Sequence, residues 1–282
     1  MKVDIRNEGT ENRAVVLNEG SKTRAAIFDL ANDIQKQGTT ANHYDLLSCF
    51  HYKEMKHRKA DIDQSFPVTY QWIFRDTTKH RWATFSAWLA GPEKVYWISG
   101  KPGSGKSTLM KYILSSKELL TKLSEARPNV QITIICHFMW LAGSEAQHTR
   151  RGLLAALIYE LAQKDKDVRT FAESTVKLHP SRRDLRDWPV DDLEDLLIDG
   201  IKQHQGLVYI SIDGYDEFIH SEHKPKLLQL LKRLTEMENI KLCVSSRPEK
   251  WLVDHFHGRP MLKVQDLNEG DIETMVTETL EK

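Results

Sequence analysis

Hydrophobic positions along the chain change their period near residue 94. Five short apolar runs rich in β-branched and aromatic residues follow: Val95–Ser99, Ile132–Phe138, Leu207–Ile212, Leu242–Ser245 and Met261–Val264. Helical patterns alternate with them: Ser107–Ser115, Arg151–Ala162, Leu193–Gln203, Lys226–Glu236 and Asp271–Glu281. Strands that alternate with helices in this way predict βαβ units, and therefore an α/β fold with a parallel sheet covered on both faces.

The first 90 residues follow a different pattern. Residues 1–20 are polar and predict a loose start, and residues 22–60 suggest two helices before a break at Pro67. In the second helix Leu46, Leu47 and Phe50 would share one face, extended by Met55 and Ile62. The basic stretch HYKEMKHRKA (51–60) is interpreted as a solvated helix face rather than a phosphate-binding patch. We therefore expect a helical extension over residues 1–90 and an α/β domain over residues 91–282.

Aromatic residues gather just before the change of period. They are Trp72, Phe74, Trp82, Phe85 and Trp88. Several recur at helical spacing, so packing in a core is favoured over a ligand cage.

Composition narrows the class of protein. The 282 residues include 40 basic and 40 acidic side chains, so no bulk charge favours nucleic acid or an anionic membrane. The three cysteines are far apart in the sequence, which favours reduced thiols and a reducing compartment. The polar start and the lack of an apolar run long enough to span a bilayer predict a cytoplasmic protein. His220 and His223 have no third ligand nearby in sequence and are interpreted as surface residues.

The stretch GKPGSGKS (100–107) matches the phosphate-loop pattern G-x-x-x-x-G-K-[ST] between a predicted strand and a predicted helix. Glycines at 100, 103 and 105 leave room for backbone N–H groups to face phosphate oxygens, and the helix N-terminus adds further donors. Lys106 would reach the β- and γ-phosphates, and the Ser107 hydroxyl would bind Mg²⁺. The predicted nucleotide-binding residues are Gly100, Lys101, Pro102, Gly103, Ser104, Gly105, Lys106, Ser107 and Thr108.

An acidic strand end is the second signal. In LVYISIDGYDEF (207–218) an apolar run leads directly into Asp213, with Asp216 and Glu217 close behind. An acid at a buried strand end needs a cation or a donor, so Asp213 is the second predicted Mg²⁺ residue, after Ser107. Either Asp216 or Glu217 could polarise an attacking water, and an exposed turn is the alternative for both.

An arginine follows the fourth predicted strand. CVSSRP (243–248) places Arg247 at a strand's carboxyl end, where ligands of parallel sheets gather. There a guanidinium can sense the γ-phosphate or stabilise charge in the transition state. A salt bridge to a neighbouring loop is the alternative. Together the segments predict Lys106, Asp216, Glu217 and Arg247 as the catalytic group.

These three segments, in this order, resemble the NACHT family of STAND signal-transduction P-loop NTPases. More narrowly they are similar to its fungal nephrocystin-like N-terminal type, found in heterokaryon-incompatibility and NOD-like-receptor proteins. The segments that carry this resemblance are YWISGKPGSGKSTLMKYI (96–113), IDGYDEF (212–218) and CVSSRP (243–248), supported by LLSCFHYKEMKHRKADID (46–63), YQWIF (70–74), WATFSAWLAG (82–91), DWPVDDLEDLL (187–197) and LKVQDLNEGDIETMV (262–276).

The resemblance implies a P-loop NTPase fold of three layers, αβα, with a five-stranded parallel sheet in the order 5-1-4-3-2. It also implies ATP or ADP with Mg²⁺ as ligands, and GTP as the alternative nucleotide. The family's winged-helix region and repeat array have no counterpart among these 282 residues, so protein partners are expected to act through regions outside this chain, with self-association as a further candidate. The lead-in QSFPVTY (64–70) lacks the family's usual histidine, and Phe66 and Tyr70 are candidates to stack on adenine in its place.

Three functions stay open from the sequence. The first is an ATP-dependent signalling switch with slow, Mg²⁺-dependent hydrolysis, in fungal non-self recognition or innate-immunity-like signalling. The second is a truncated, non-catalytic interaction module that binds ADP tightly or binds nothing. The third is a P-loop kinase, which needs an acceptor pocket and an arginine-rich lid, and for which SRRDLRD (181–187) offers Arg182, Arg183 and Arg186.

Overall fold

The computed structural model describes residues 46–62, 70–74, 84–218 and 224–266. Several predictions therefore lie outside the described residues. They are the loose segment 1–20, the first N-terminal helix, the break at Pro67, the side chains of Phe66 and Trp82, the pair His220 and His223, and the helix Asp271–Glu281.

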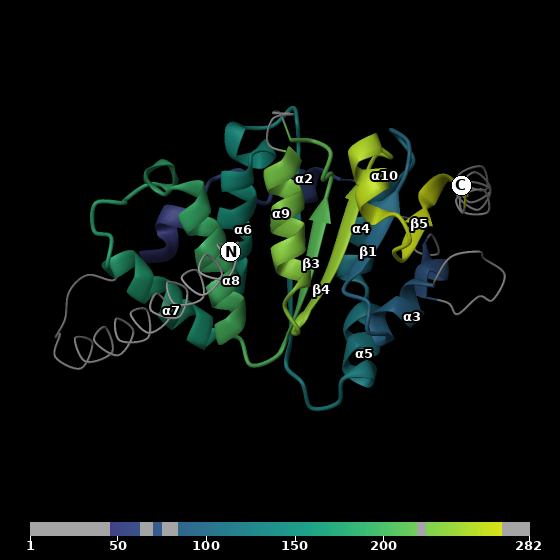
Figure 1. Cartoon of the computed structure of the whole chain (residues 1–282), viewed down its shortest axis with the longest axis horizontal. Helices are drawn as coiled ribbons and strands as arrows, with labels where there is room; N and C mark the ends of the chain where they lie inside the picture. The colour runs from purple at the N-terminus through teal and green to yellow at the C-terminus, as the bar shows by residue number, and fades with distance from the viewer. Residues whose placement is uncertain (1–45, 63–69, 75–83, 219–223, 267–282) are drawn as a thin grey trace, which may run out of the picture.

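A five-stranded parallel sheet forms the centre of the described chain (Figure 1). Its strands are β1 (Val95–Ser99), β2 (Ile132–Phe138), β3 (Leu207–Asp213), β4 (Ile240–Ser246) and β5 (Met261–Lys263). They lie in the order β2-β3-β4-β1-β5, and every pair runs parallel. This is the order 5-1-4-3-2 read from the opposite edge, so the predicted fold class is confirmed.

Two hydrophobic cores lie on opposite faces of this sheet. Successive side chains of a strand point to opposite faces, so Val95 and Trp97 of β1 enter one core while Tyr96 and Ile98 enter the other. The first core is covered by α6 (Arg150–Lys164), α8 (Val190–Gln203), α9 (Lys224–Thr235) and α10 (Lys250–Phe256). The second is covered by α3 (Phe85–Ala90), α4 (Lys106–Ser115) and α5 (Lys117–Ala126). The result is the expected three-layer αβα architecture of P-loop NTPases.

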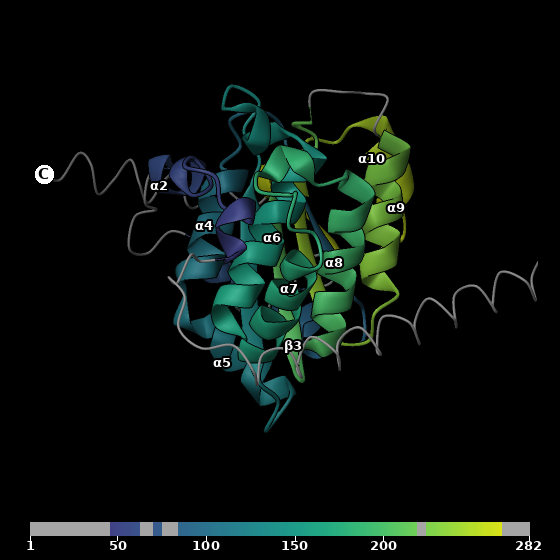
Figure 2. The ribbon, with the colours of Figure 1, turned by 90° about the vertical axis from the view of Figure 1, so that its left-hand side faces the viewer.

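Helix α7 (Lys166–Lys177) lies outside this arrangement, against α6 and α8 (Figure 2). Short 3-10 helices complete the connections: η3 (Glu145–His148), η4 (Leu185–Asp187) and η6 (Val264–Asp266). Among the described residues, none of the helices is both long and apolar enough to cross a bilayer.

The predicted second N-terminal helix is wrong as a single element. Leu46–Phe50 forms a 3-10 helix, η1, and His57–Asp61 forms the short α2, with non-helical residues between them. The segment is divided because its apolar side chains pack in two different cores. Leu47 and Phe50 enter the first core, whereas Ile62 enters the second, and one straight helix cannot serve both faces of the sheet.

The aromatic segment packs as the sequence predicts. Phe74 of η2 (Gln71–Phe74) joins Phe85 and Trp88 of α3 in the second core, and Trp72 packs against it. The described members of the set are therefore core residues rather than a ligand cage.

A buried lysine ties α3 to the sheet. The Lys241 side chain in β4 is buried and donates hydrogen bonds to the carbonyl oxygens of Trp88 (2.6 Å), Gly91 (2.7 Å) and Glu93 (2.7 Å). Its ammonium also lies 5.0 Å from the centre of the Trp88 ring. Burial lowers the pKa of Lys241 to about 7. One amino group thus satisfies three carbonyls, which fixes the end of α3 where it approaches β1.

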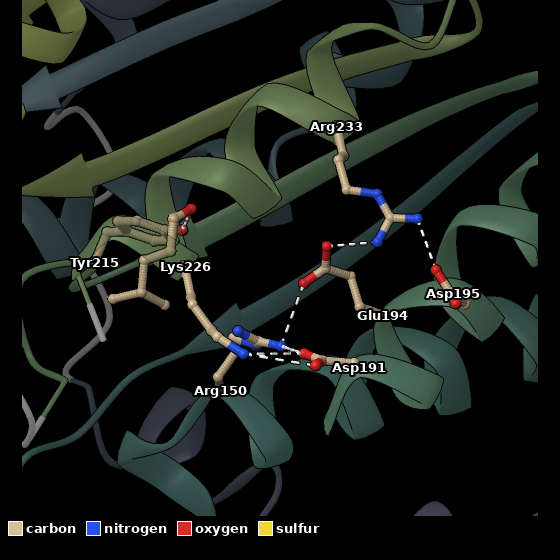
Figure 3. Close-up of polar contacts among 8 residues, drawn as sticks. Arg150, Asp191, Glu194, Asp195, Tyr215, Lys226 and Arg233 are labelled. Carbon is tan, nitrogen blue, oxygen red and sulfur yellow. Dashed lines mark hydrogen bonds and ion pairs between the residues drawn. The ribbon is translucent and has the colours of Figure 1, made fainter. Parts of the chain in front are cut away.

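A charge network joins α6, α8 and α9 on the other face (Figure 3). Glu194 of α8 accepts from Arg233 of α9 at 2.6 Å and lies 3.6 Å from Arg150 of α6. Arg150 also pairs with Asp191, to which Lys226 adds a contact at 3.5 Å. The Arg150 and Glu194 side chains are only 9% and 6% exposed, so each depends on the other partners for its charge to be tolerated.

Removing the central carboxylate is expected to destabilise the fold. Glu194→Ala removes the carboxylate that lies beside the buried Arg150 guanidinium and binds Arg233. We expect the free energy of unfolding, measured by urea denaturation, to fall by about 2–4 kcal/mol. Glu236→Ala is the matched control, because its pair with Lys232 is exposed and spans 3.9 Å. We expect the control to change stability by less than about 0.5 kcal/mol. Equal midpoints for the two variants would contradict this account of the network.

Candidate functional site

The loop after β1 has the conformation that its glycines allow. Gly103 and Gly105 have φ of 74° and 82°, a region that side-chain-bearing residues rarely adopt. At Gly100 a Cβ would lie 2.4 Å from the Ser104 hydroxyl oxygen, so no larger residue fits without movement. The Gly100 N–H donates to the carbonyl of Ser246 at 3.2 Å, which fixes the start of the loop against the end of β4.

Lys106 begins α4 and folds back over the loop. Its ammonium donates to the carbonyl oxygens of Gly100 (2.8 Å) and Lys101 (2.9 Å). Burial lowers the pKa of Lys106, while the nearby Asp216 and Asp213 carboxylates oppose that shift. The preceding N-cap residue, Gly105, offers no side chain to cap the helix, so the first N–H groups of α4 are not capped by it. Such a helix start suits an anionic group.

Asp213 lies against this loop. The Ser245 hydroxyl donates a hydrogen bond to its carboxylate. Asp213 is buried, and burial raises its pKa, while the neighbouring Ser107 and Ser245 hydroxyls act in the opposite direction. The loop and the acidic strand end, which are about 100 residues apart in sequence, therefore meet at one edge of the sheet.

A buried carboxylate beside a hydroxyl is a donor set that fits Mg²⁺, which prefers oxygen ligands and retains several waters. Ser107 and Asp213 would supply one oxygen ligand each. Ser245 is the residue that sequence reasoning did not assign here, because the sequence shows a serine at a strand end but not which carboxylate its hydroxyl contacts.

Asp216 and Arg247 bind each other. Asp216 accepts from the Arg247 backbone N–H at 2.9 Å, and its other oxygen lies 3.3 Å from Arg247 Nε. The Asp216 side chain is 6% exposed and that of Arg247 is 45% exposed. The salt-bridge alternative for Arg247 is thus the observed arrangement, and Asp216 is positioned to hold Arg247 at the end of β4 rather than to face solvent alone.

Glu217 has a different environment. Its carboxylate accepts from the Leu141 N–H at 3.0 Å, just beyond the end of β2, and it has no arginine partner within the described residues. Burial raises the pKa of Glu217, the Leu141 hydrogen bond opposes this, and the charges of Asp216 and Asp213 raise the pKa further. A half-buried carboxylate with a raised pKa is a better candidate for a general base than the arginine-bound Asp216.

The turn that carries these acids is firmly anchored. Gly214 has φ of 72°, which lets the chain reverse directly after Asp213. Tyr215 is fully buried, and its hydroxyl donates to the Leu227 carbonyl of α9 at 2.8 Å (Figure 3). Its N–H donates to the Ser245 carbonyl at 2.8 Å. Tyr215 therefore links the acidic turn to α9, which carries part of the charge network.

Two other predicted features lie away from this cluster. Tyr70 is 6% exposed and packs in the second core beside Trp72 and Tyr112, so its ring is occupied by protein contacts. The SRRDLRD segment does not form a lid over the loop: Arg182 binds Asp192 at 2.7 Å and Arg186 lies 3.7 Å from Glu145. This segment lines a cavity of about 490 Å³ together with η1 and η3, and no residue of 100–108 or 213–217 lines that cavity.

The model of one protein family matches this chain: the nephrocystin 3 N-terminal family, over residues 68–247. The match covers more than half of the chain and includes the phosphate loop, Asp213 and the acidic turn, ending at Arg247. The chain belongs to the nephrocystin 3 N-terminal family. A comparison with curated proteins finds no match.

Solved structures overlap this family member only in part. ORC1 of Aeropyrum pernix, in complex with DNA, has 15% identity and a TM-score of 0.42, covering 72% of this chain and 53% of its own. Aeropyrum pernix ORC2, in ADPNP–ADP complexes, has 13% identity and a TM-score of 0.38, covering 68% and 51%. C. elegans PCH-2 has 14% identity and a TM-score of 0.34, covering 61% and 35%. The chain thus spans about a third to a half of the proteins it matches, and its fold assignment rests on the strand order and the loop.

Proposed function

We propose that this chain is the nucleotide-binding core of a NACHT-type STAND signalling switch that binds ATP or ADP with Mg²⁺ and hydrolyses ATP slowly. The observation that carries the proposal is how the ends of β1, β4 and β3 meet. The Gly100 N–H of the loop donates to the Ser246 carbonyl at 3.2 Å, and the adjacent Ser245 hydroxyl donates to the buried Asp213 carboxylate. This arrangement brings a glycine loop with N–H donors, a lysine and a buried carboxylate to one edge of the sheet. The family match over residues 68–247 supports the same conclusion.

Each side chain of the cluster has a role in this proposal. Backbone N–H groups of residues 103–108 bind the phosphates, and Lys106 leaves the loop carbonyls to bind the β- and γ-phosphates. Ser107 and Asp213 hold the Mg²⁺, which neutralises phosphate charge when it is bound. Glu217 orients the attacking water, and Asp216 positions Arg247 so that its guanidinium can turn toward the γ-phosphate. GTP is the alternative nucleotide.

The domain division follows from this assignment. Residues 91–282 are the proposed nucleotide-binding domain and residues 1–90 the proposed extension, of which the described residues Phe50, Phe74 and Trp88 lie in the two cores. A ligand can shift a switch only through its different affinity for the two states. The γ-phosphate supplies that difference here, and the response passes to protein partners outside this chain or to a second copy. The thiols of Cys49, Cys136 and Cys243 are buried and outside any disulfide, which fits the proposed reducing, cytoplasmic setting.

A non-catalytic nucleotide-binding module is the second candidate. The pairing of Asp216 with Arg247 favours it, because an arginine held by a carboxylate is not directed at a phosphate. In that case the chain binds nucleotide and does not hydrolyse it. A kinase finds less support, since the cavity beside SRRDLRD is not lined by the phosphate loop.

Calorimetric titration of the purified chain with ATP and ADP, with and without Mg²⁺, tests the proposal. We expect both nucleotides to bind with dissociation constants between about 1 μM and 1 mM, and Mg²⁺ to strengthen ATP binding at least about tenfold. Chromatography of nucleotide released from the purified protein identifies what it carries, and phosphate release separates the switch from the non-catalytic module. Absence of binding for both nucleotides at about 1 mM would overturn the proposal.

A further inference from the structure

The short helix α2 is docked beside the site by contacts from three elements. The Lys111 ammonium of α4 donates to the carbonyls of Ala60, at 3.3 Å, and Ile62. Lys59 of α2 reaches the Cys136 sulfur of β2 at 3.3 Å. The Gln147 amide of η3 donates to the Glu54 carbonyl at 3.1 Å, just before α2. The basic stretch 51–60 is therefore fixed against the carboxyl end of β2 rather than solvated along its length.

Arg58 is the residue of α2 that this docking directs toward the acidic turn. Its guanidinium lies 5.7 Å from the centre of the Trp140 ring. The Arg58 Nε is sheltered from solvent and has no hydrogen-bond partner among the described residues. The aromatic ring orients the guanidinium, and the unpaired N–H can donate a hydrogen bond to an anionic group.

Trp140 lies between two contacts with the acidic turn. The preceding Met139 donates its N–H to the Asp213 carbonyl at 2.9 Å, and the following Leu141 donates to the Glu217 carboxylate at 3.0 Å. The backbone of β2's end therefore runs along the acidic turn, and the guanidinium over Trp140 lies next to it. Burial raises the pKa of both Asp213 and Glu217, and the positive charge of Arg58 is one of the groups that oppose this rise.

We propose that Arg58 is a γ-phosphate sensor: its guanidinium binds the terminal phosphate of a nucleoside triphosphate and so couples α2 and the N-terminal extension to the nucleotide state. The inference rests on the proposed nucleotide site and adds to it a residue from outside the α/β domain. It revises the interpretation of stretch 51–60 as a solvated helix face at this one position.

The chemistry favours the terminal phosphate over the other phosphates. Glycine-loop N–H groups and Lys106 lie on the β1 and α4 side of the site, whereas Arg58 approaches from the end of β2, beside Glu217. Glu217 is the acid proposed to orient the water that attacks the γ-phosphate. A cation next to that acid reaches the end of the triphosphate that ADP lacks, and an Arg–phosphate pair can form two parallel hydrogen bonds.

Equilibrium binding of ATPγS and ADP to wild type, Arg58→Ala and Arg58→Lys, with Mg²⁺ present, tests the proposal without a need for hydrolysis. We expect Arg58→Ala to weaken ATPγS binding by about 10- to 100-fold and ADP binding by less than about 3-fold. Arg58→Lys keeps the charge and should fall between wild type and Arg58→Ala. Lys56→Ala is the matched control, since its exposed side chain caps nothing and precedes the same helix. The control should leave both affinities unchanged.

Hydrogen–deuterium exchange supplies a second readout. Amides of residues 57–62 should be protected by ATPγS more than by ADP in wild type, and equally by both in Arg58→Ala. A purely structural role predicts instead that Arg58→Ala weakens both nucleotides by the same factor, and that result overturns the proposal. The absence of any change in either affinity overturns it as well. If wild type binds neither nucleotide, the nucleotide site itself is wrong, which is distinct from failure at Arg58 alone.

Discussion

Lys106→Ala should reduce the affinity for ATP by about 100-fold or more, the largest effect on binding expected for this chain. The Lys106 ammonium is held over the loop by the carbonyls of Gly100 and Lys101. The nearby Asp213 and Asp216 carboxylates favour its charged form, since both raise the pKa of Lys106 against the effect of burial. Hydrogen bonds from a charged donor are worth roughly 1.5–3 kcal/mol each, so the loss of one or two to the phosphates corresponds to that change. Fluorescence titration with a mant-labelled ATP measures it directly.

The variant also removes the two hydrogen bonds that Lys106 makes to its own loop, so folding must be controlled. Lys117→Ala deletes the same charge from the exposed start of α5 and should bind ATP as wild type does. Circular dichroism and a urea titration compare the folds of the three proteins. Equal ATP affinity in wild type and Lys106→Ala, with both folded, would rule out the phosphate-loop function.

Much of the sheet could be predicted because its strands are buried on both faces. Continuous apolar runs gave the bounds of β1 and β2 as the structure has them, and placed β3 and β4 within two residues. The glycines of the loop and the position of Asp213 at a strand end were equally readable. In each case one local pattern determines the element, and its partners lie directly adjacent in the sheet.

Elements whose form depends on distant contacts could not be predicted in this way. Helix α10 has seven residues, of which only Leu252 and Phe256 are buried, so it offers too few apolar positions to show a period. Helices α5 and α7 are a different case, because Leu119 and Leu123, and Val168, Ala172 and Val176, recur at helical spacing, and the sequence reasoning missed them. Residues 46–62 show an apolar spacing typical of a helix, yet the two cores pull Phe50 and Ile62 to opposite faces of the sheet. Tertiary packing overrides the local pattern there.

The site shows the same limit at the level of side chains. A sequence presents Asp216, Glu217 and Arg247 as three charged residues near two strand ends, with nothing to decide which pair forms. The structure joins Asp216 to Arg247 and leaves Glu217 on the Leu141 N–H. That difference assigns separate roles to two neighbouring acids, and it is the basis of the next prediction.

Glu217→Gln should lower the rate of ATP hydrolysis by about 10²- to 10⁴-fold while changing ATP affinity by less than about 3-fold. Glutamine keeps the size of the side chain, and its amide oxygen can still accept from the Leu141 N–H, so the local structure is preserved. The amide cannot take a proton from water at neutral pH. Single-turnover hydrolysis, compared with mant-ATP binding for the same protein, separates the chemical step from binding.

The pH profile adds a test of the assignment. Because burial raises the pKa of Glu217, its basic form is lost as the pH falls through that raised value, so wild-type hydrolysis should fall on the acidic side. Glu217→Gln should lack this dependence on Glu217. Glu249→Gln, at an exposed position just before α10 where the side chain caps nothing, is the matched control and should hydrolyse ATP as wild type does. If Asp216→Asn abolishes hydrolysis and Glu217→Gln does not, the two acids have exchanged roles and the paired geometry at Arg247 must open during the reaction.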